Sequence, residues 1–106
     1  MIHLEYYLLT AKIITPPEDI IAVEGEDVQF ESTVHMPNSN IQPQWGRVDS
    51  SGSPENITLE KHHQKLTLTI RGTSKEHEGK YALQVGNEKH ESELIVKGNF
   101  VQRYIE

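Results

Sequence analysis

The sequence contains no cysteine. Without a thiol the chain can form no disulfide, no zinc finger and no cysteine nucleophile. A chain of 106 residues that dispenses with disulfides is more typical of a reducing compartment, so we expect a cytoplasmic protein. Packing has to replace the missing cross-link, since closing a loop of roughly fifty residues would contribute about 4 kcal/mol on the chain-entropy model.

Positive charge is scarce. The chain has 10 Lys and Arg against 16 Asp and Glu, which gives a formal net charge of −6 at pH 7. Binding to nucleic acid depends largely on Lys and Arg that meet phosphates, and anionic membranes attract the same side chains. The balance therefore disfavours nucleic acid and membrane surfaces as partners and indicates a soluble, acidic surface.

A long hydrophobic run is also missing. The most apolar stretch, residues 1–11, is interrupted by His3 and Glu5 and is far shorter than the roughly 20 residues that span a bilayer. It has neither the basic start nor the small-residue cleavage site of a secretory signal peptide. We expect no membrane-spanning segment and no export signal.

What the chain does have, over residues 12–97, is a series of short runs in which apolar and polar residues alternate. In residues 27–35, for example, Val28, Phe30 and Val34 point to one side of a strand. Strands are predicted at residues 12–15, 20–23, 27–35, 43–48, 57–60, 65–71, 80–86 and 91–97, with a turn or helical turn at 75–79 and a hairpin turn at 86–87. This spacing predicts one all-β domain, either a sandwich or a barrel.

Trp45 and Tyr81 favour the sandwich. In an immunoglobulin-type sandwich a tryptophan packs on a disulfide between the two sheets, and a tyrosine stands two residues before the second cysteine. Here Ser32 and Leu83 stand at the two cysteine positions. The sequence therefore predicts an immunoglobulin-like antiparallel β-sandwich without the disulfide, in which the Tyr81 hydroxyl bonds back to the backbone near the preceding turn. The predicted core residues are Phe30, Ser32, Trp45, Leu68, Tyr81 and Leu83.

The order of these features resembles the intermediate-set (I-set) immunoglobulin domains of intracellular muscle and cytoskeletal proteins, the titin, obscurin and myomesin group. The stretches that carry the resemblance are PPEDIIAVEGEDVQFESTV, Trp45, LTLTI, KEHEGKYALQVGN and ESELIV. Besides the replaced cysteines, Gly46 stands where a bulky aromatic is frequent, and His77 stands where the family usually has an acidic residue. The second change is expected to weaken a salt bridge at one end of the sandwich.

The resemblance implies a non-enzymatic module of a larger sarcomeric or cytoskeletal protein. Such a module bears tension and docks protein partners, including neighbouring immunoglobulin domains and other filament proteins. Two alternatives stay open: an extracellular adhesion or receptor domain that lacks its disulfide, and a regulatory domain beside a kinase or exchange-factor domain. The glycosylation sequon at Asn56, Ile57 and Thr58 favours the extracellular alternative, and the missing cysteines disfavour it.

The two ends, residues 1–11 and 98–106, fall outside the predicted sandwich. Apolar residues recur at helical spacing in both, which suggests helical linkers, although short isolated helices are marginal in water and the alternative is partial disorder. Tyr6 and Tyr7 would form part of an exposed apolar patch, so we also expect the N-terminal segment to pack on its own domain or on a second copy.

Motifs for catalysis or for a cofactor are not apparent. His62 and His63 adjoin each other, but a metal site needs three or four converging ligands. The chain has no Gly-x-Ser-x-Gly elbow, no phosphate-binding loop and no dinucleotide fingerprint. The sequence therefore predicts no catalytic, metal-binding or cofactor-binding residues.

Overall fold

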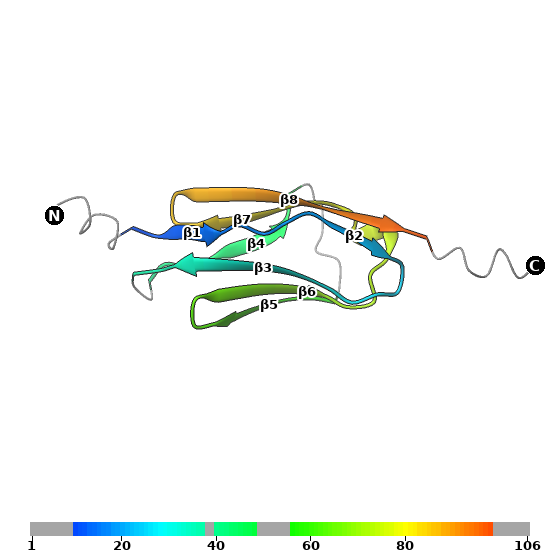
Figure 1. The fold of residues 1–106 in the computed structure, drawn as a ribbon, viewed down its shortest axis with the longest axis horizontal. Helices are drawn as coiled ribbons and strands as arrows, with labels where there is room; N and C mark the ends of the chain where they lie inside the picture. Colours follow the sequence, from blue (N-terminus) through cyan, green and yellow to red (C-terminus); the bar gives the residue numbers. More distant parts are fainter. Residues whose placement is uncertain (1–9, 38–39, 49–55, 99–106) are drawn as a thin grey trace, which may run out of the picture.

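The structure, a computed structural model, describes residues 10–37, 40–48 and 56–98. These residues form eight β-strands and one short 3-10 helix, η1, arranged as two stacked sheets (Figure 1). In chain order the elements are β1 (Lys12–Thr15), β2 (Ile20–Val23), β3 (Val28–His35), β4 (Gln44–Arg47), β5 (Ile57–His62), β6 (Lys65–Ile70), η1 (Lys75–His77), β7 (Gly79–Val85) and β8 (Glu88–Lys97).

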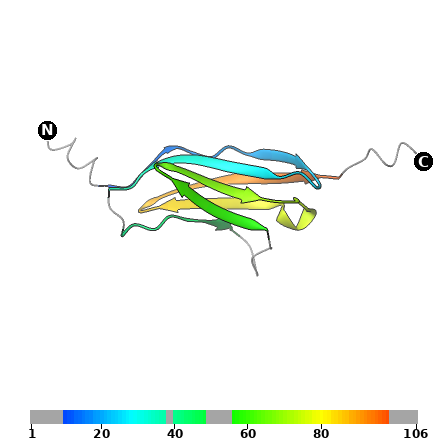
Figure 2. The same cartoon turned by 90° about the horizontal axis from the view of Figure 1, so that it is seen from below.

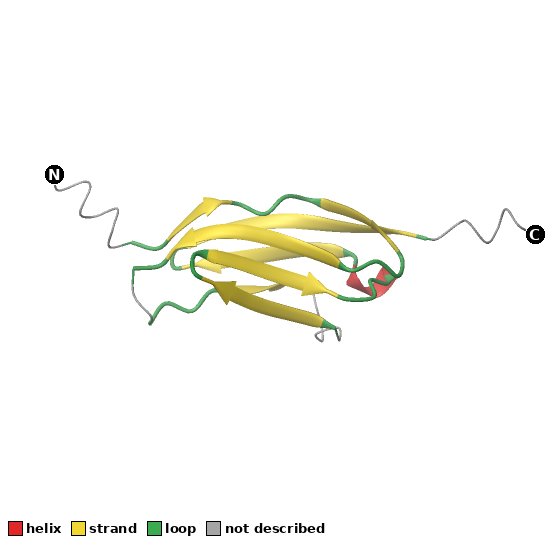
Figure 3. Ribbon diagram, turned by 60° about the horizontal axis from the view of Figure 1, so that its bottom comes forward, coloured by secondary structure: helices red, strands yellow, loops and turns green. Residues whose placement is uncertain are grey.

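Each sheet contains four strands, and the fold is the predicted immunoglobulin-like sandwich. The strand orders are β1–β3–β6–β5 in the first sheet and β2–β8–β7–β4 in the second. Neighbouring strands are antiparallel except for β2 and β8, which are parallel. Figures 2 and 3 show the two layers, with the strands of both running along the long direction of the domain.

The chain changes sheets between its first two strands. β1 pairs with β3 as far as Thr15, which lies opposite Thr33, and β2 then pairs with β8 in the other sheet. Pro16 and Pro17 lie between them. A proline has no N–H to donate to a ladder, so the two prolines end the first pairing, and the chain crosses to the other sheet.

The core lies between the sheets, and along the longer strands every second side chain points into it. An aromatic cluster occupies its centre: the Phe30 ring centroid is 5.4 Å from that of Tyr81 and 6.3 Å from that of Trp45. The six predicted core residues are all buried. The buried hydrophobic residues are Ala11, Ala22, Phe30, Val34, Trp45, Leu66, Leu68, Ile70, Tyr81, Leu83, Val85, Leu94 and Val96.

Most predicted strands agree with the structure to within one residue, and two are longer than predicted. β8 begins at Glu88 rather than at residue 91, because Gly86 and Asn87 form a two-residue turn and Val85 pairs with Glu88. β5 extends to His62, since the whole of it pairs with β6. Both extensions are polar and exposed or half-exposed, so hydrophobic alternation did not mark them. In the described part of the chain, no helix has the length and apolar character needed to cross a membrane.

The predicted linkers, residues 1–11 and 98–106, lie almost wholly outside the described residues. Ala11 is described, and it is buried in the hydrophobic core cluster. It packs beside Gly86, where a Cβ atom would lie 2.9 Å from the Ala11 Cβ. The packed sandwich therefore includes Ala11.

This contact predicts the outcome of a matched pair of glycine substitutions. Gly72 and Gly86 have φ angles of +59° and +60°, but a Cβ at Gly72 would meet nothing within 4 Å. Gly72→Ala should cost about 1–2 kcal/mol of unfolding free energy because of the left-handed backbone alone. Gly86→Ala should cost roughly 1–2 kcal/mol more, because it also overpacks the site against Ala11.

Urea denaturation at equilibrium measures both values. Adding Ala11→Gly to Gly86→Ala should recover the extra loss, whereas the same substitution in the wild type should not stabilise the domain. Equal costs for the two glycine variants would show that Ala11 does not pack at this turn.

Candidate functional site

The two cysteine positions lie in opposite sheets, Ser32 on β3 and Leu83 on β7. Both side chains are buried, with 2% and 0% of their surface exposed. The Ser32 hydroxyl donates a hydrogen bond of 2.8 Å to the backbone oxygen of Thr15. The polar group that replaces a sulfur therefore links β3 to β1, within one sheet and at the residue where the chain leaves that sheet.

A second buried serine provides a contrast. Ser92 on β8 lies opposite Tyr81 in the register, and its hydroxyl has no hydrogen-bond partner. The Trp45 indole nitrogen and the Thr73 hydroxyl are also buried without a partner. A buried polar group without a partner loses its hydration and gains little in return.

The two serines should therefore respond oppositely to alanine. Ser32→Ala should lower the unfolding free energy by about 0.5–1.5 kcal/mol, since it removes the hydrogen bond to the Thr15 carbonyl. Ser92→Ala should be neutral or stabilising by up to about 1 kcal/mol, because it removes a hydroxyl that has no partner. Thermal and urea denaturation of the two variants give the comparison. If the two substitutions changed the unfolding free energy equally, the Ser32 hydrogen bond would contribute no more than the partnerless hydroxyl of Ser92.

Tyr81 makes the predicted hydrogen bond to the backbone of the preceding turn, an arrangement called a tyrosine corner. Its hydroxyl donates to the backbone oxygen of His77 at 2.5 Å, which fixes the start of β7 against η1. His77 is itself buried, and its Nδ1 accepts a hydrogen bond of 2.9 Å from the Ser74 backbone N–H. A histidine at this position thus supplies an acceptor to the first turn of η1, so the exchange of the usual acidic residue does not leave the turn without a cap.

The carboxylate next to it holds η1 to the second sheet. Glu78 Oε1 accepts from the Val96 backbone N–H at 2.8 Å and from the Lys75 ammonium group at 3.3 Å. The hydrogen bond from Val96, and after it the one from Lys75, lowers the pKa of Glu78 below its ordinary value of 4.5. Sequence reasoning did not single out Glu78, although an acidic residue directly before the turn glycine was visible.

This lowered pKa has a stability consequence with a definite sign. Because the folded-state pKa lies below 4.5, the ionised Glu78 favours folding above that pH, and its contribution is lost as the pH falls through the folded-state pKa. Glu78→Gln keeps an oxygen acceptor but cannot titrate. We predict that the unfolding free energy falls less steeply below about pH 5 in Glu78→Gln than in the wild type.

Urea denaturation at a series of pH values measures both slopes. Glu76→Gln, an exposed carboxylate on the same turn, serves as the control and should leave the slope closer to that of the wild type. Identical slopes for Glu78→Gln and the wild type would contradict the assignment.

Other carboxylates bind backbone N–H groups in the same way. Glu88 links the two sheets, since its Oε1 accepts from the Ile13 N–H at 2.6 Å while its Oε2 lies 3.3 Å from Lys12 Nζ. Asp19 Oδ1 accepts from the Glu93 N–H at 2.8 Å, and Glu26 Oε1 accepts from the Val23 N–H at 2.7 Å. Both ends of β2 are therefore held by acidic side chains.

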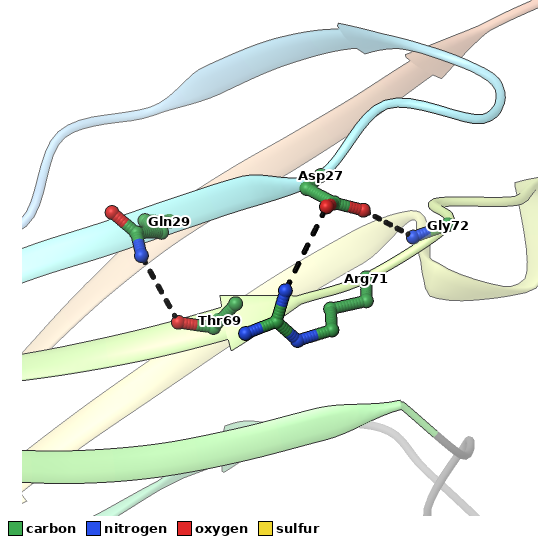
Figure 4. A network of polar contacts seen from close by, with 5 residues as sticks. All are labelled: Asp27, Gln29, Thr69, Arg71 and Gly72. Atoms are coloured by element: carbon green, nitrogen blue, oxygen red, sulfur yellow. Dashed lines mark hydrogen bonds and ion pairs between the residues drawn. The ribbon is translucent and has the colours of Figure 1, made fainter.

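Asp27 forms a further tie at the end of β6 (Figure 4). Its Oδ1 accepts from the Gly72 N–H at 2.8 Å, and its Oδ2 lies 3.8 Å from Arg71 Nη1. Gln29 donates to the Thr69 hydroxyl at 3.4 Å across the same two strands. Both charged side chains are well exposed, so the ion pair adds little and the hydrogen bond to the backbone is the stronger contact.

A pull on the described chain reaches first β1 with its ladder to β3 and then the parallel pair of β2 and β8. Ile20–Val23 run beside Leu94–Lys97 in the same direction. The described chain enters at the end of the sandwich where β1 begins and leaves at the opposite end, where β8 ends (Figure 1). Pulling these ends apart slides β2 against β8 and loads their hydrogen bonds together rather than one after another.

Exposed apolar side chains also gather on this pair. Ile21 is 66% exposed, and the register places it opposite Ile95, which is 38% exposed. Val23 follows two residues later on the same side of β2 and is 39% exposed. The outer face of β2 and β8 thus carries three branched aliphatic side chains beside polar neighbours.

The remaining residues singled out from the sequence lie on the surface. His62 and His63 are exposed, with ring centroids 4.4 Å apart, and the described residues place no third potential metal ligand with them. Asn56 of the sequon is exposed and has a φ of 72°. Gly46, next to Trp45, has open space where a Cβ would stand.

Comparison with known proteins agrees with this architecture. The immunoglobulin I-set domain family matches residues 11–97. The chain belongs to the immunoglobulin I-set family, as the resemblance predicted.

Solved structures with the same fold include muscle proteins. The titin M3 domain superposes with a TM-score of 0.75 at 21% identity, over 84% of this chain and 98% of that one. The titin domains Z1Z2 in complex with telethonin give 0.73 at 20% identity, over 85% and 49%. The twitchin kinase region of C. elegans gives 0.73 at 17% identity, over 84% and 16%. At these identities the likeness concerns the fold.

Proposed function

We propose that this chain is a non-enzymatic structural and protein-interaction module of a larger sarcomeric or cytoskeletal protein, bears tension in the cytoplasm and docks protein partners. The observation that carries the proposal is the parallel pairing of β2 with β8 between opposite ends of the sandwich. The Asp19 carboxylate joins the start of β2 to β8 by accepting from the Glu93 N–H, and Glu26 caps the other end of β2 through the Val23 N–H. The likeness to titin and twitchin domains supports the muscle context.

Two further observations support the docking role. The outer face of β2 and β8 exposes Ile21, Val23 and Ile95, a group of apolar side chains of the kind that partner proteins cover. The titin Z1Z2 structure is a complex with another protein, telethonin, and another similar structure is a tandem of titin domains, I9–I11. We therefore propose neighbouring immunoglobulin domains and other filament proteins as partners.

A mechanical experiment tests the tension-bearing role. The Glu24 N–H donates to the Lys97 oxygen, while the N–H and C=O of Val23 both bond Glu26. By alternation, the N–H groups of Ala22 and Ile20 point toward β8. Ile20→Pro therefore removes one bond of the ladder, whereas Ile20→Ala removes the same side chain packing and keeps the N–H.

We predict that the wild-type domain, pulled from its two ends between handle proteins, unfolds in one cooperative force peak. The Ile20→Pro variant should unfold at a lower force than Ile20→Ala at the same pulling speed, because fewer bonds share the load. Gradual extension of the wild type without a peak, or equal forces for the two variants, would count against the proposal.

The exposed sequon gives one specific observation in favour of a second function, an extracellular adhesion or receptor domain. The absence of cysteine from the chain weighs against it, since small secreted domains rely on disulfides. The third candidate is a regulatory domain beside a kinase or exchange-factor domain. The likeness to the twitchin kinase region supports it.

A further inference from the structure

Among the described strands, the crossing of the chain between β1 and β2 leaves part of β3 without a neighbour on the β1 side. β6 pairs with β3 from Val28 to Thr33, but β1 reaches only as far as Thr33 before the chain crosses to the other sheet. Within the part of the chain that the structure describes, residues 28–32 therefore have a strand on one side alone. A strand edge of this kind presents backbone donors and acceptors that another extended chain can pair with.

The direction of the backbone groups can be read from one hydrogen bond. The Val34 N–H donates to the Gln64 oxygen on the β6 side, so by alternation Ser32 and Phe30 also face β6. The N–H and C=O groups of Gln29 and Glu31 then point to the open side. Each of these two residues can exchange a donor and an acceptor with an added strand.

A groove of about 500 Å³ lies along this open edge, and we call it the switch groove. Its lining includes Glu18 and Asp19 from the crossover, Gln29 and Glu31 from β3, and Lys65 from β6. One wall is the crossover between β1 and β2, and the other is β3 itself. The open edge is about five residues long, which at roughly 3.3 Å per residue accommodates a short extended segment.

The charges around the switch groove select the kind of segment. Three acidic side chains line it, Glu18, Asp19 and Glu31, against one cation, Lys65. Lys65 Nζ already lies 3.2 Å from Glu31 Oε2, so this pair is balanced within the domain. Glu18 and Asp19 leave a net negative charge on the crossover wall. A second copy of this chain, with a net charge of −6, is the less favourable occupant.

We propose that the switch groove binds a short, extended, basic segment of a partner protein, which pairs with the backbone of Gln29 and Glu31 as an added strand. Lysine or arginine side chains of the segment lie beside Glu18 and Asp19, while the backbone bonds supply the alignment. This inference locates a docking site for the interaction role proposed above and rests on that role.

NMR titration of the ¹⁵N-labelled full chain tests the proposal. The probe is the capped pentapeptide Lys-Val-Lys-Val-Lys, and the readout is the amide shifts of Gln29 and Glu31. The same peptide with N-methyl groups on alternate residues, prepared in both registers, retains the charge but cannot form the ladder. The capped pentapeptide Glu-Val-Glu-Val-Glu retains the strand propensity but reverses the charge.

We expect Lys-Val-Lys-Val-Lys to shift both amides and the other peptides to shift them little. Glu18→Lys should weaken binding by about threefold to tenfold, as expected for reversal of one exposed charge. Glu60→Lys, the same charge change on the exposed face of β5, should leave binding nearly unaltered.

Two results would overturn the proposal. One is the absence of shifts at Gln29 and Glu31. The other is binding that survives N-methylation of the peptide and that Glu18→Lys and Glu60→Lys weaken equally. Such binding would be a general attraction of the basic peptide to the acidic surface. If the peptide does not bind but the domain still unfolds in one force peak, the docking site is refuted and the tension-bearing role is not. If the force peak is absent but the peptide binds, the tension-bearing role is refuted and the docking site is not.

Discussion

The crossing of the first strand from one sheet to the other determines much of this domain. Because Pro16 and Pro17 cannot extend the β1–β3 ladder, the chain has to leave it at Thr15. The crossing allows β2 to run parallel to β8 at the far edge of the second sheet, and it opens the groove along β3. The Ser32 hydroxyl holds the chain at the point of departure, through the Thr15 carbonyl.

The stability that a disulfide would supply has to come from two other sources. The first is the packing of Phe30, Trp45 and Tyr81 between the sheets, together with the aliphatic side chains around them. The second is a set of carboxylates, each accepting a hydrogen bond from a backbone N–H, at Asp19, Glu26, Asp27, Glu78 and Glu88. Hydrogen bonds of this charge-assisted kind are stronger than neutral ones. The excess of acidic residues is therefore partly structural.

Sequence alone predicted the sandwich, because its signals are local. Alternation marked the strands, and Tyr81 marked the hydrogen bond from its hydroxyl to the turn before β7. The carboxylate ties could not be predicted in this way. Glu88 and Ile13 are 75 residues apart in sequence, and Asp19 and Glu93 are 74 apart. Such contacts depend on how the sheets meet, and alternation carries no information about that.

The switch groove was equally hidden, since an unpaired stretch of β3 is defined by the strand that is missing beside it. The same acidic side chains that we expect to attract a basic segment also repel a second copy of the domain. In the filament proposed above, where similar domains would stand at high local concentration, an open strand edge would invite swapping of strands between neighbours. We therefore expect the negative charge along the crossover to disfavour such misassembly and to admit a partner of opposite charge.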